Sequence, residues 1–184
     1  MAASTGWANS AREGEAVERI PLTGWQTYTG HLERYRWAAS RTRRGERVND
    51  IACGIGYGAT FFTHASSYRG WDKPGIPEAA HFPGTYCGAD IDDPAWAPEP
   101  CDVTCCFETL EHAKDPAALA RVIMASTARS VFVSVPVIPT MFCNEYHRSD
   151  FTVDDIPALF PGWVVAEEWP QPEETSHVWE FTRA

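Results

Sequence analysis

Short apolar runs alternate with longer polar or amphipathic stretches along most of the chain, a pattern typical of the strands and helices of α/β proteins. Seven runs predict strands, at residues 48–52, 68–71, 85–88, 102–107, 130–135, 163–167 and 178–182. Four stretches predict helices, at residues 30–43, 59–65, 115–128 and 152–160. The third helix has the clearest start, because Asp115 is a good N-cap and Pro116 suits the first helical position.

Strands that alternate with helices predict a Rossmann-like α/β fold, with a mostly parallel sheet of about seven strands and helices on both faces. The last two strands predict a C-terminal antiparallel hairpin. The length of 184 residues suits a single domain, with an N-terminal arm and a helix in residues 1–46 and the Rossmann-like core in residues 47–184. Three prolines within residues 73–84 exclude a full helix between the second and third strands.

Targeting and membrane signals are missing from the sequence. Residues 1–20 hold no apolar signal-peptide region, and no run approaches the roughly 18 apolar residues of a membrane span. The six cysteines form no C-x-x-C pair, so a zinc ribbon or a thioredoxin-like motif is unsupported. We therefore expect a cytoplasmic protein that does not bind membranes.

The charge of the chain disfavours polyanionic partners. The net charge is −10, which opposes general binding to nucleic acids or to anionic membranes. One segment differs, because six of the 15 basic residues fall within fourteen positions: Arg34, Arg36, Arg41, Arg43, Arg44 and Arg47. This run is either a solvated helix face or a basic edge for an anionic substrate.

A glycine-rich loop follows the first predicted strand. Residues 50–58 read Asp-Ile-Ala-Cys-Gly-Ile-Gly-Tyr-Gly, a turn that lets backbone N–H groups approach a ligand closely. Gly54, Gly56 and Ala59 also fit a dinucleotide fingerprint, so an NAD-dependent oxidoreductase stays an alternative. Asp50 favours a different ligand, because its carboxylate would repel a pyrophosphate but can orient a loop that holds a cationic amino acid.

Two further aspartates follow the second and third strands. Ligands of open α/β sheets bind beyond the carboxyl ends of the strands, so these carboxylates and the glycine loop should meet. Asp72 ends the second strand, where a carboxylate can accept hydrogen bonds from both ribose hydroxyls. Asp90 follows the third strand, where it would accept from an adenine amino group, with Ile91 flanking the ring.

These motifs resemble those of the class I S-adenosylmethionine-dependent methyltransferases, in which an acidic residue precedes G-x-G-x-G and a second acid ends the next strand. Two further segments are similar to those of a subgroup often associated with glycan and small-molecule modification: His31-x-x-Arg34-Tyr35-x-Trp37-Ala38 and Phe107-Glu108-Thr109-Leu110-Glu111-His112. The resemblance implies S-adenosylmethionine as cofactor, bound by Asp50, Ala52, Gly54, Gly56, Asp72, Asp90, Ile91 and Phe107, with His31 and Tyr35 on a helix that covers its methionine end. Ala52 replaces the first glycine of the pattern, a mild change if its φ is negative.

A cluster of acidic and histidine residues follows the fourth strand. Glu108, Glu111 and His112 would share one face if the chain turned helical there, and His147 follows the fifth strand. Solvated carboxylates, a general base or substrate contact, and a divalent metal site are the three interpretations. The Glu-x-x-Glu-His motif with a later histidine resembles the magnesium site of small-RNA 3′-terminal 2′-O-methyltransferases and of some quinone O-methyltransferases. The resemblance thus implies Glu108, Glu111, His112 and His147 as ligands of Mg²⁺ or Mn²⁺.

The sequence therefore predicts a methyltransferase that acts on a hydroxyl of a sugar, a glycan or another small molecule, with Glu108, Glu111 and His112 as the candidate catalytic residues. A ribose O-methyltransferase acting on RNA or a nucleotide with a divalent metal, and a non-catalytic methyltransferase-like binding module, are the alternatives. The short chain carries no inserted cap over the pocket, so either the acceptor is large or a second subunit, as in a homodimer, completes the site.

Overall fold

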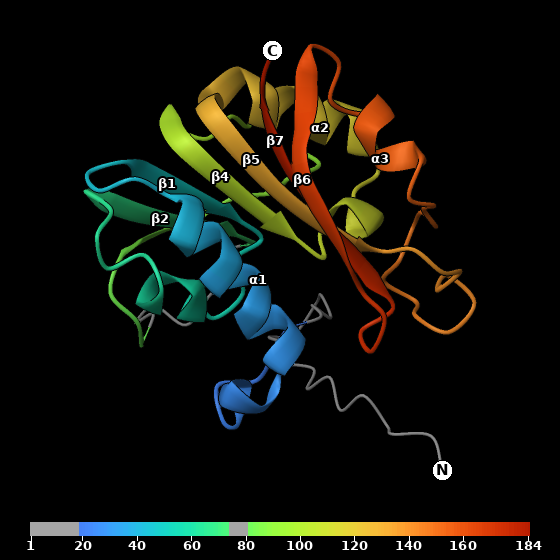
Figure 1. The fold of residues 1–184 in the computed structure, drawn as a ribbon. Coiled ribbons are helices and arrows are strands. Elements are labelled where there is room, and N and C mark those ends of the chain that lie inside the picture. Colours follow the sequence, from blue (N-terminus) through green and yellow to red (C-terminus); the bar gives the residue numbers. More distant parts are fainter. Residues whose placement is uncertain (1–18, 74–80) are drawn as a thin grey trace.

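The computed structural model describes residues 19–73 and 81–184, which contain one seven-stranded sheet (Figure 1). The strand order is β3–β2–β1–β4–β5–β7–β6, and only β7 runs antiparallel to its neighbours. The strands are β1 (Arg47–Ile51), β2 (Ser67–Asp72), β3 (Thr85–Gly88), β4 (Cys101–Phe107), β5 (Thr127–Pro136), β6 (Trp163–Gln171) and β7 (Ser176–Arg183). The predicted Rossmann-like sheet with its C-terminal antiparallel hairpin is confirmed.

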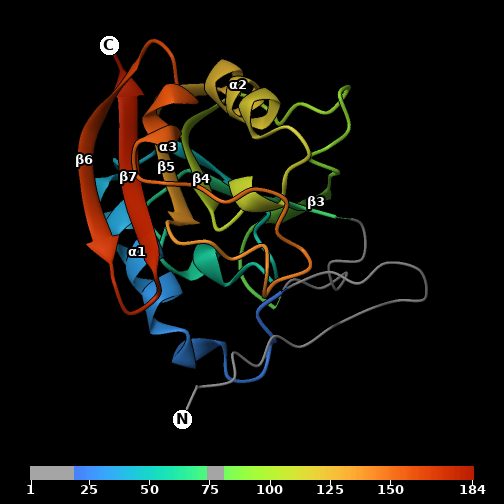
Figure 2. The same ribbon diagram turned by 90° about the vertical axis from the view of Figure 1, so that its right-hand side faces the viewer.

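Helices cover both faces of the sheet, with α1 (Thr29–Arg41) on one face and α2 (Pro116–Ser126) and α3 (Asp155–Ala158) on the other (Figures 1 and 2). As predicted, Asp115 caps α2, since its Oδ1 accepts a hydrogen bond of 2.8 Å from Ala118 N.

The other two predicted helices are much shorter than expected. Residues 59–65 contribute only to a 3₁₀ turn, η2 (Tyr57–Thr60), because their aromatic and β-branched side chains are weak helix formers. Residues 152–160 form the single turn of α3, since Pro157 supplies no N–H to a longer helix. Two further 3₁₀ turns are η1 (Trp25–Thr27) and η3 (Leu110–His112). The proline-rich segment falls mostly on residues 74–80, outside the described residues.

The apolar strands read as continuous runs because they are buried on both faces. In β5, Val131 and Val133 belong to the core beneath α2, whereas Phe132 belongs to the core beneath α1. In β4, Cys106 and Cys105 divide in the same way, and both are fully buried. No helix in the described part of the chain has the length and apolarity that crossing a membrane requires.

The order of the strands places a crevice at the end of β1. From β1 the chain builds outward to β2 and β3, then returns to β4 on the opposite side of β1. Connections that leave a parallel sheet in opposite directions open a crevice beyond the carboxyl ends of the strands. The loops after β1 and β4 therefore border the place where an open α/β sheet binds its ligands.

The loop after β1 begins with a strained alanine. Ala52 has a φ of +57°, and Gly54 and Gly56 follow with φ values of +58° and +85°. The negative φ that would make alanine a mild replacement for glycine is therefore not present, and the left-handed conformation costs an alanine roughly 1–2 kcal/mol.

A buried carboxylate joins α1 to the sheet. Asp50 of β1 is 1% exposed, and its Oδ2 accepts hydrogen bonds from the hydroxyls of Tyr35 on α1 and Tyr68 on β2. Burial raises the pKa of Asp50 from its ordinary value of 3.8 to about 7, although the two hydroxyls oppose the shift. The carboxyl group is therefore protonated in the folded state at pH values where it ionises in the unfolded chain.

We predict that Asp50→Asn flattens the pH dependence of stability between about pH 4 and 7. In the wild type the unfolded chain loses this proton first, so the free energy of unfolding should fall by up to about 1.4 kcal/mol per pH unit until the folded state also ionises. Urea unfolding at several pH values measures the effect. Asp102→Asn is the control, because the Arg47 side chain lowers the pKa of Asp102 and its contribution disappears only in acid. Parallel pH curves for Asp50→Asn and the wild type would contradict the prediction.

We also predict that Ala52→Gly stabilises the fold by about 0.5–1 kcal/mol. Relief of the left-handed strain should exceed the conformational entropy that a glycine loses on folding. The matched control is Ala113→Gly. Ala113 is buried with a φ of −71°, so the change relieves no strain there and should destabilise the protein. Chemical unfolding of the three proteins tests this, and equal destabilisation of both variants would disprove it.

Candidate functional site

A pocket of about 450 Å³ lies beyond the carboxyl ends of β1, β2 and β4. Ala52, Glu108 and Thr175, the three non-glycine residues with a positive φ in the described part of the chain, all line it. Each such conformation costs of order 1–3 kcal/mol and persists only where the surrounding structure enforces it. Strain gathered around one cavity marks this pocket as the candidate functional site.

Asp72 organises the half of the pocket next to the glycine loop. Its Oδ2 accepts a hydrogen bond of 2.7 Å from Gly54 N, which ties the loop after β1 to the end of β2. Its Oδ1 accepts from Arg19 Nη2 at 2.6 Å and from Lys73 N at 2.7 Å. These bonds use three of the about four acceptor positions of a carboxylate.

Arg19 is a pocket residue that the sequence analysis missed. Its side chain is 6% exposed, and both Arg19 and Ile20 line the pocket beside Asp72. Arg19 precedes the first regular element by several residues, in a segment without hydrophobic periodicity. No local pattern in such a segment indicates which basic residue folds back onto the sheet.

Seven of the predicted cofactor residues line the pocket: His31, Tyr35, Ala52, Gly54, Asp72, Ile91 and Phe107. His31 reaches it from α1, and its Nδ1 lies 3.3 Å from the hydroxyl of Tyr57 in η2. Burial, followed by the nearby Arg34 charge, lowers the pKa of His31 well below 6.5, so its imidazole is neutral. Tyr57 also stacks on Trp25, which packs the segment before α1 against the glycine loop.

The structure does not bring Asp50, Gly56 or Asp90 to the pocket wall. Asp50 is buried and hydrogen-bonded to Tyr35 and Tyr68, so it does not line the pocket. Gly56 packs against Tyr86, where an added Cβ would meet the ring at 2.3 Å. The glycine therefore lets the backbone of the loop lie directly against the Tyr86 ring.

Asp92 takes the place that was expected for Asp90. Asp90 is exposed, and its Oδ1 accepts a hydrogen bond of 3.0 Å from Asp92 N in a turn. That turn directs Asp92 to the pocket instead, where its carboxylate accepts from Lys114 N at 2.8 Å and from Arg148 Nη1 at 3.3 Å. Three of the four residues after Ala89 are acidic, so spacing alone could not decide which one faces the pocket.

Glu108 does not share a helical face with Glu111 and His112. Its φ of +47° turns the backbone away from a helical path before η3 begins. The carboxylate turns instead to the buried Arg34, whose Nη1 lies 3.1 Å away, and accepts hydrogen bonds from Ser134 at 2.8 Å and Ser176 at 3.0 Å. Glu108 therefore links α1, β5 and β7 at the edge of the pocket.

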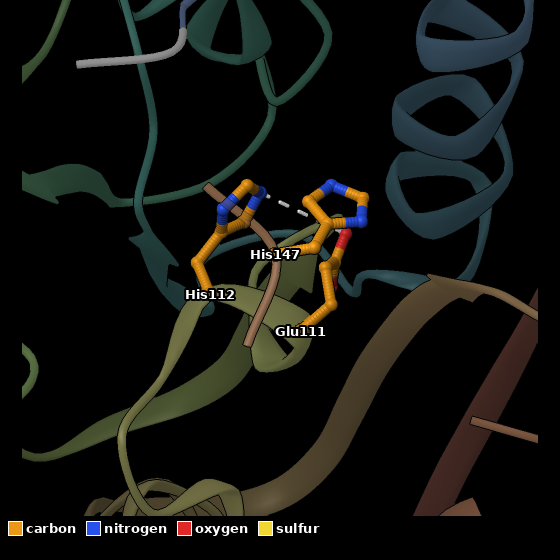
Figure 3. A group of neighbouring side chains, drawn as sticks. All are labelled: Glu111, His112 and His147. Carbon is orange, nitrogen blue, oxygen red and sulfur yellow. Dashed lines mark ion pairs between the residues drawn. The ribbon is translucent and has the colours of Figure 1, made fainter. Parts of the chain in front are cut away.

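Glu111, His112 and His147 form a compact cluster in the wall of the pocket (Figure 3). One potential ligand atom from each residue lies within 4.8 Å of the others, and Glu108 is not among them. Glu111 is 1% exposed, and its Oε1 lies 3.9 Å from His112 Nε2. The cluster thus joins η3 to the loop after β5.

Hydrogen bonds fix both imidazoles. His112 Nδ1 donates to Tyr146 O at 3.1 Å. His147 Nδ1 lies 2.6 Å from Thr140 Oγ1, and it is the donor because the Thr140 hydroxyl itself donates to Asp150 Oδ1 at 3.3 Å. Burial, followed by the neighbouring His147, lowers the pKa of His112 to about 4, and burial also lowers the pKa of His147. Both rings are therefore neutral near pH 7, the state in which histidine acts as a base or a metal ligand.

The arginine run is not a free basic edge. Arg34 is buried against Glu108, Arg41 pairs with Glu167, and Arg47 pairs with Asp102. Half of the six positive charges are thus balanced by carboxylates of this chain. These ion pairs reduce the support for the run as a binding edge for an anionic substrate to its other three members, Arg36, Arg43 and Arg44, which are exposed.

The comparisons with known proteins relate the chain to others through its fold alone. No protein-family model and no curated protein sequence matches it. Among solved structures, the putative methyltransferase bound to the Haloferax volcanii Trm112 activator is similar with a TM-score of 0.70 and 14% identity, covering 86% of this chain and 92% of that chain. Magnesium protoporphyrin IX methyltransferase from Synechocystis PCC 6803 with bound S-adenosylhomocysteine is similar with a TM-score of 0.69 and 14% identity, covering 91% of this chain and 90% of that chain.

The [4+2]-cyclase SpnF is also similar, with a TM-score of 0.67, 12% identity and coverage of 90% of this chain and 84% of that chain. A fold at such low identity does not specify the reaction. The architecture itself is clear: this chain has the fold of the class I S-adenosylmethionine-dependent methyltransferases.

Proposed function

We propose that the chain is an S-adenosylmethionine-dependent methyltransferase that methylates a hydroxyl oxygen of a small molecule, with sugars and glycans among the candidates. The observation that carries the proposal is one pocket at the sheet's crevice that joins a glycine turn to a polar cluster. The turn and Asp72 line this pocket together with the cluster of Glu111, His112 and His147. A donor and an acceptor can therefore meet within a single cavity.

The glycine-loop half would bind the cofactor. The backbone of Ala52, Cys53 and Gly54 forms one wall, and Asp72 would accept hydrogen bonds from the ribose hydroxyls. Because one acceptor position of Asp72 remains open, the second hydroxyl would replace the Arg19 guanidinium. His31 and Tyr35 of α1 would cover the methionine end, as the family resemblance implies.

The protein's main task in methyl transfer is to align the acceptor. The sulfonium already activates the methyl group, so catalysis requires an acceptor oxygen in line at about 3 Å and the exclusion of water. Glu108 is positioned for this role, because Arg34, Ser134 and Ser176 restrain its carboxylate from three elements. A restrained carboxylate can orient a hydroxyl without moving during the reaction.

A hydroxyl acceptor must also lose its proton. His112 is neutral, and its Nε2 faces the cluster, so it can accept that proton near pH 7. Glu111, buried beside it, would stabilise the imidazolium that results. His112 and Glu111 therefore keep the general-base role that the sequence predicted for the cluster.

We further propose that the cluster can bind a divalent cation. Neutral imidazoles held by hydrogen bonds at Nδ1, together with a buried carboxylate, fit a metal site. Because Glu108 is turned away, the donor set of one carboxylate and two imidazoles suits Mn²⁺, Fe²⁺ or Zn²⁺ better than Mg²⁺. When bound, such a cation would lower the pKa of an acceptor hydroxyl.

An RNA acceptor is less well supported. The net charge is −10, and three arginines of the basic run are engaged in ion pairs. A protein that neutralises several phosphates needs unpaired basic side chains along one face.

We predict that the protein binds S-adenosylhomocysteine and that Asp72→Asn weakens the binding at least about tenfold, because the amide retains the shape but loses one acceptor oxygen and the charge that strengthens hydrogen bonds from the ribose hydroxyls. Isothermal titration calorimetry measures both affinities. The control is Asp102→Asn at the amino end of β4, which should bind like the wild type. No binding to the wild type would favour a non-catalytic module.

We predict that the wild type binds one Mn²⁺ and that Glu111→Gln weakens this binding about 100-fold, since the variant loses the only charged ligand of the cluster. Electron paramagnetic resonance of free Mn²⁺ reports the affinity. Glu174→Gln, another carboxylate of the pocket wall, should behave as the wild type does. Equal Mn²⁺ affinity in all three proteins would show that the cation does not bind at the cluster, and the general-base role of His112 would remain.

A further inference from the structure

Three large apolar side chains are exposed on the loop between β5 and α3. In this entrance loop, residues 137–150, Ile138 is 45% exposed, Met141 is 47% exposed and Phe142 is 84% exposed. Single exposed apolar residues are common, but three within five positions concentrate exposed apolar surface on one loop, a feature that binding sites share.

Hydrogen bonds hold the entrance loop in a defined conformation. Asp150 Oδ1 accepts hydrogen bonds from Thr140 N at 2.7 Å and Met141 N at 3.0 Å, which fixes the turn that carries the apolar residues. Arg148 N donates to Glu111 O at 2.7 Å and anchors the other end of the loop to η3. The apolar side chains are thus held outward by the backbone.

The same loop also forms a wall of the pocket. Thr140 and residues 144–148 line it, while Ile138, Met141 and Phe142 do not. Polar residues of the loop therefore face the cavity. Met141 and Phe142 directly follow the lining residue Thr140 in the chain, so a molecule longer than the cavity could extend onto this exposed part of the loop.

The size and charge of the pocket restrict what enters. A volume of about 450 Å³ lies toward the lower end of the roughly 300–1,000 Å³ typical of ligand pockets. A bound cofactor would use much of this space and leave the body of an acceptor at the margin. The described residues of the wall include six carboxylates, against three lysine or arginine side chains: Asp72, Asp92, Glu108, Glu111, Glu145 and Glu174, against Arg19, Lys73 and Arg148. Anionic acceptors are therefore disfavoured.

We propose that the acceptor is a neutral hydroxylated molecule with an apolar body, and that Ile138, Met141 and Phe142 bind this body. The hydroxyl end would reach the cluster of Glu111, His112 and His147 while the apolar part stays on the entrance loop. This inference rests on the proposed function and narrows its substrate class from hydroxylated molecules in general to those with a substantial apolar part.

The test is a series of 4-alkylphenols, from methyl to pentyl, titrated into protein saturated with S-adenosylhomocysteine. The phenol hydroxyl stays constant while the apolar part grows, so affinity should rise about two- to fourfold per methylene in the wild type. In the double variant Met141→Ser/Phe142→Ser this gain should disappear. Val164→Ser/Val165→Ser is the control, because these two exposed apolar residues of β6 do not line the pocket and should leave the series unchanged.

Each outcome decides the proposal. A series without a gain in the wild type, or an equal gain in both double variants, overturns it. Binding of the wild type to phosphatidylcholine vesicles, lost in the entrance-loop variant and accompanied by a flat phenol series, would assign the patch to a lipid surface instead. Failure of the proposed function is recognised separately, because the affinity for S-adenosylhomocysteine is measured before any phenol is added.

Discussion

The hydrogen bond between Gly54 N and the Asp72 carboxylate is the contact on which the pocket depends. It joins the turn after β1 to the end of β2 at the point where the sheet's connections diverge. Ala52 and Gly54 both adopt left-handed conformations in the turn that reaches Asp72. A carboxylate buried beside backbone N–H groups is costly to leave unpaired, so this bond holds the turn in its strained shape.

A second restrained carboxylate lies in the wall of the pocket after β4. Glu108 also has a positive φ, and Arg34, Ser134 and Ser176 over-determine its position. The wall after β4 is thus fixed by α1, β5 and β7 rather than by local helix formation. Strained residues after the neighbouring strands β1 and β4 therefore line one cavity, and such strain is often found in sites prepared for a ligand.

The entrance loop adds an apolar margin to this polar cavity. Asp150 holds the loop from within, and Arg148 joins it both to Glu111 O and to the Asp92 carboxylate. The loop after β5 is therefore tied to the loops after β3 and β4. The exposed apolar residues and His147 belong to the same loop, so a ligand bound to the loop would be held at a fixed position relative to the cluster.

The sheet, its C-terminal hairpin, α1 and α2 could be predicted without a structure, because apolar periodicity and the Asp115 cap are local signals. The glycine turn and Asp72 could be predicted as well, since strand ends in an open sheet meet at one edge. The folded chain was needed to show that Glu108 turns to Arg34, that Asp92 replaces Asp90 in the pocket and that Arg19 reaches Asp72. These choices depend on positive φ values and on contacts between residues distant in sequence, which no spacing rule encodes.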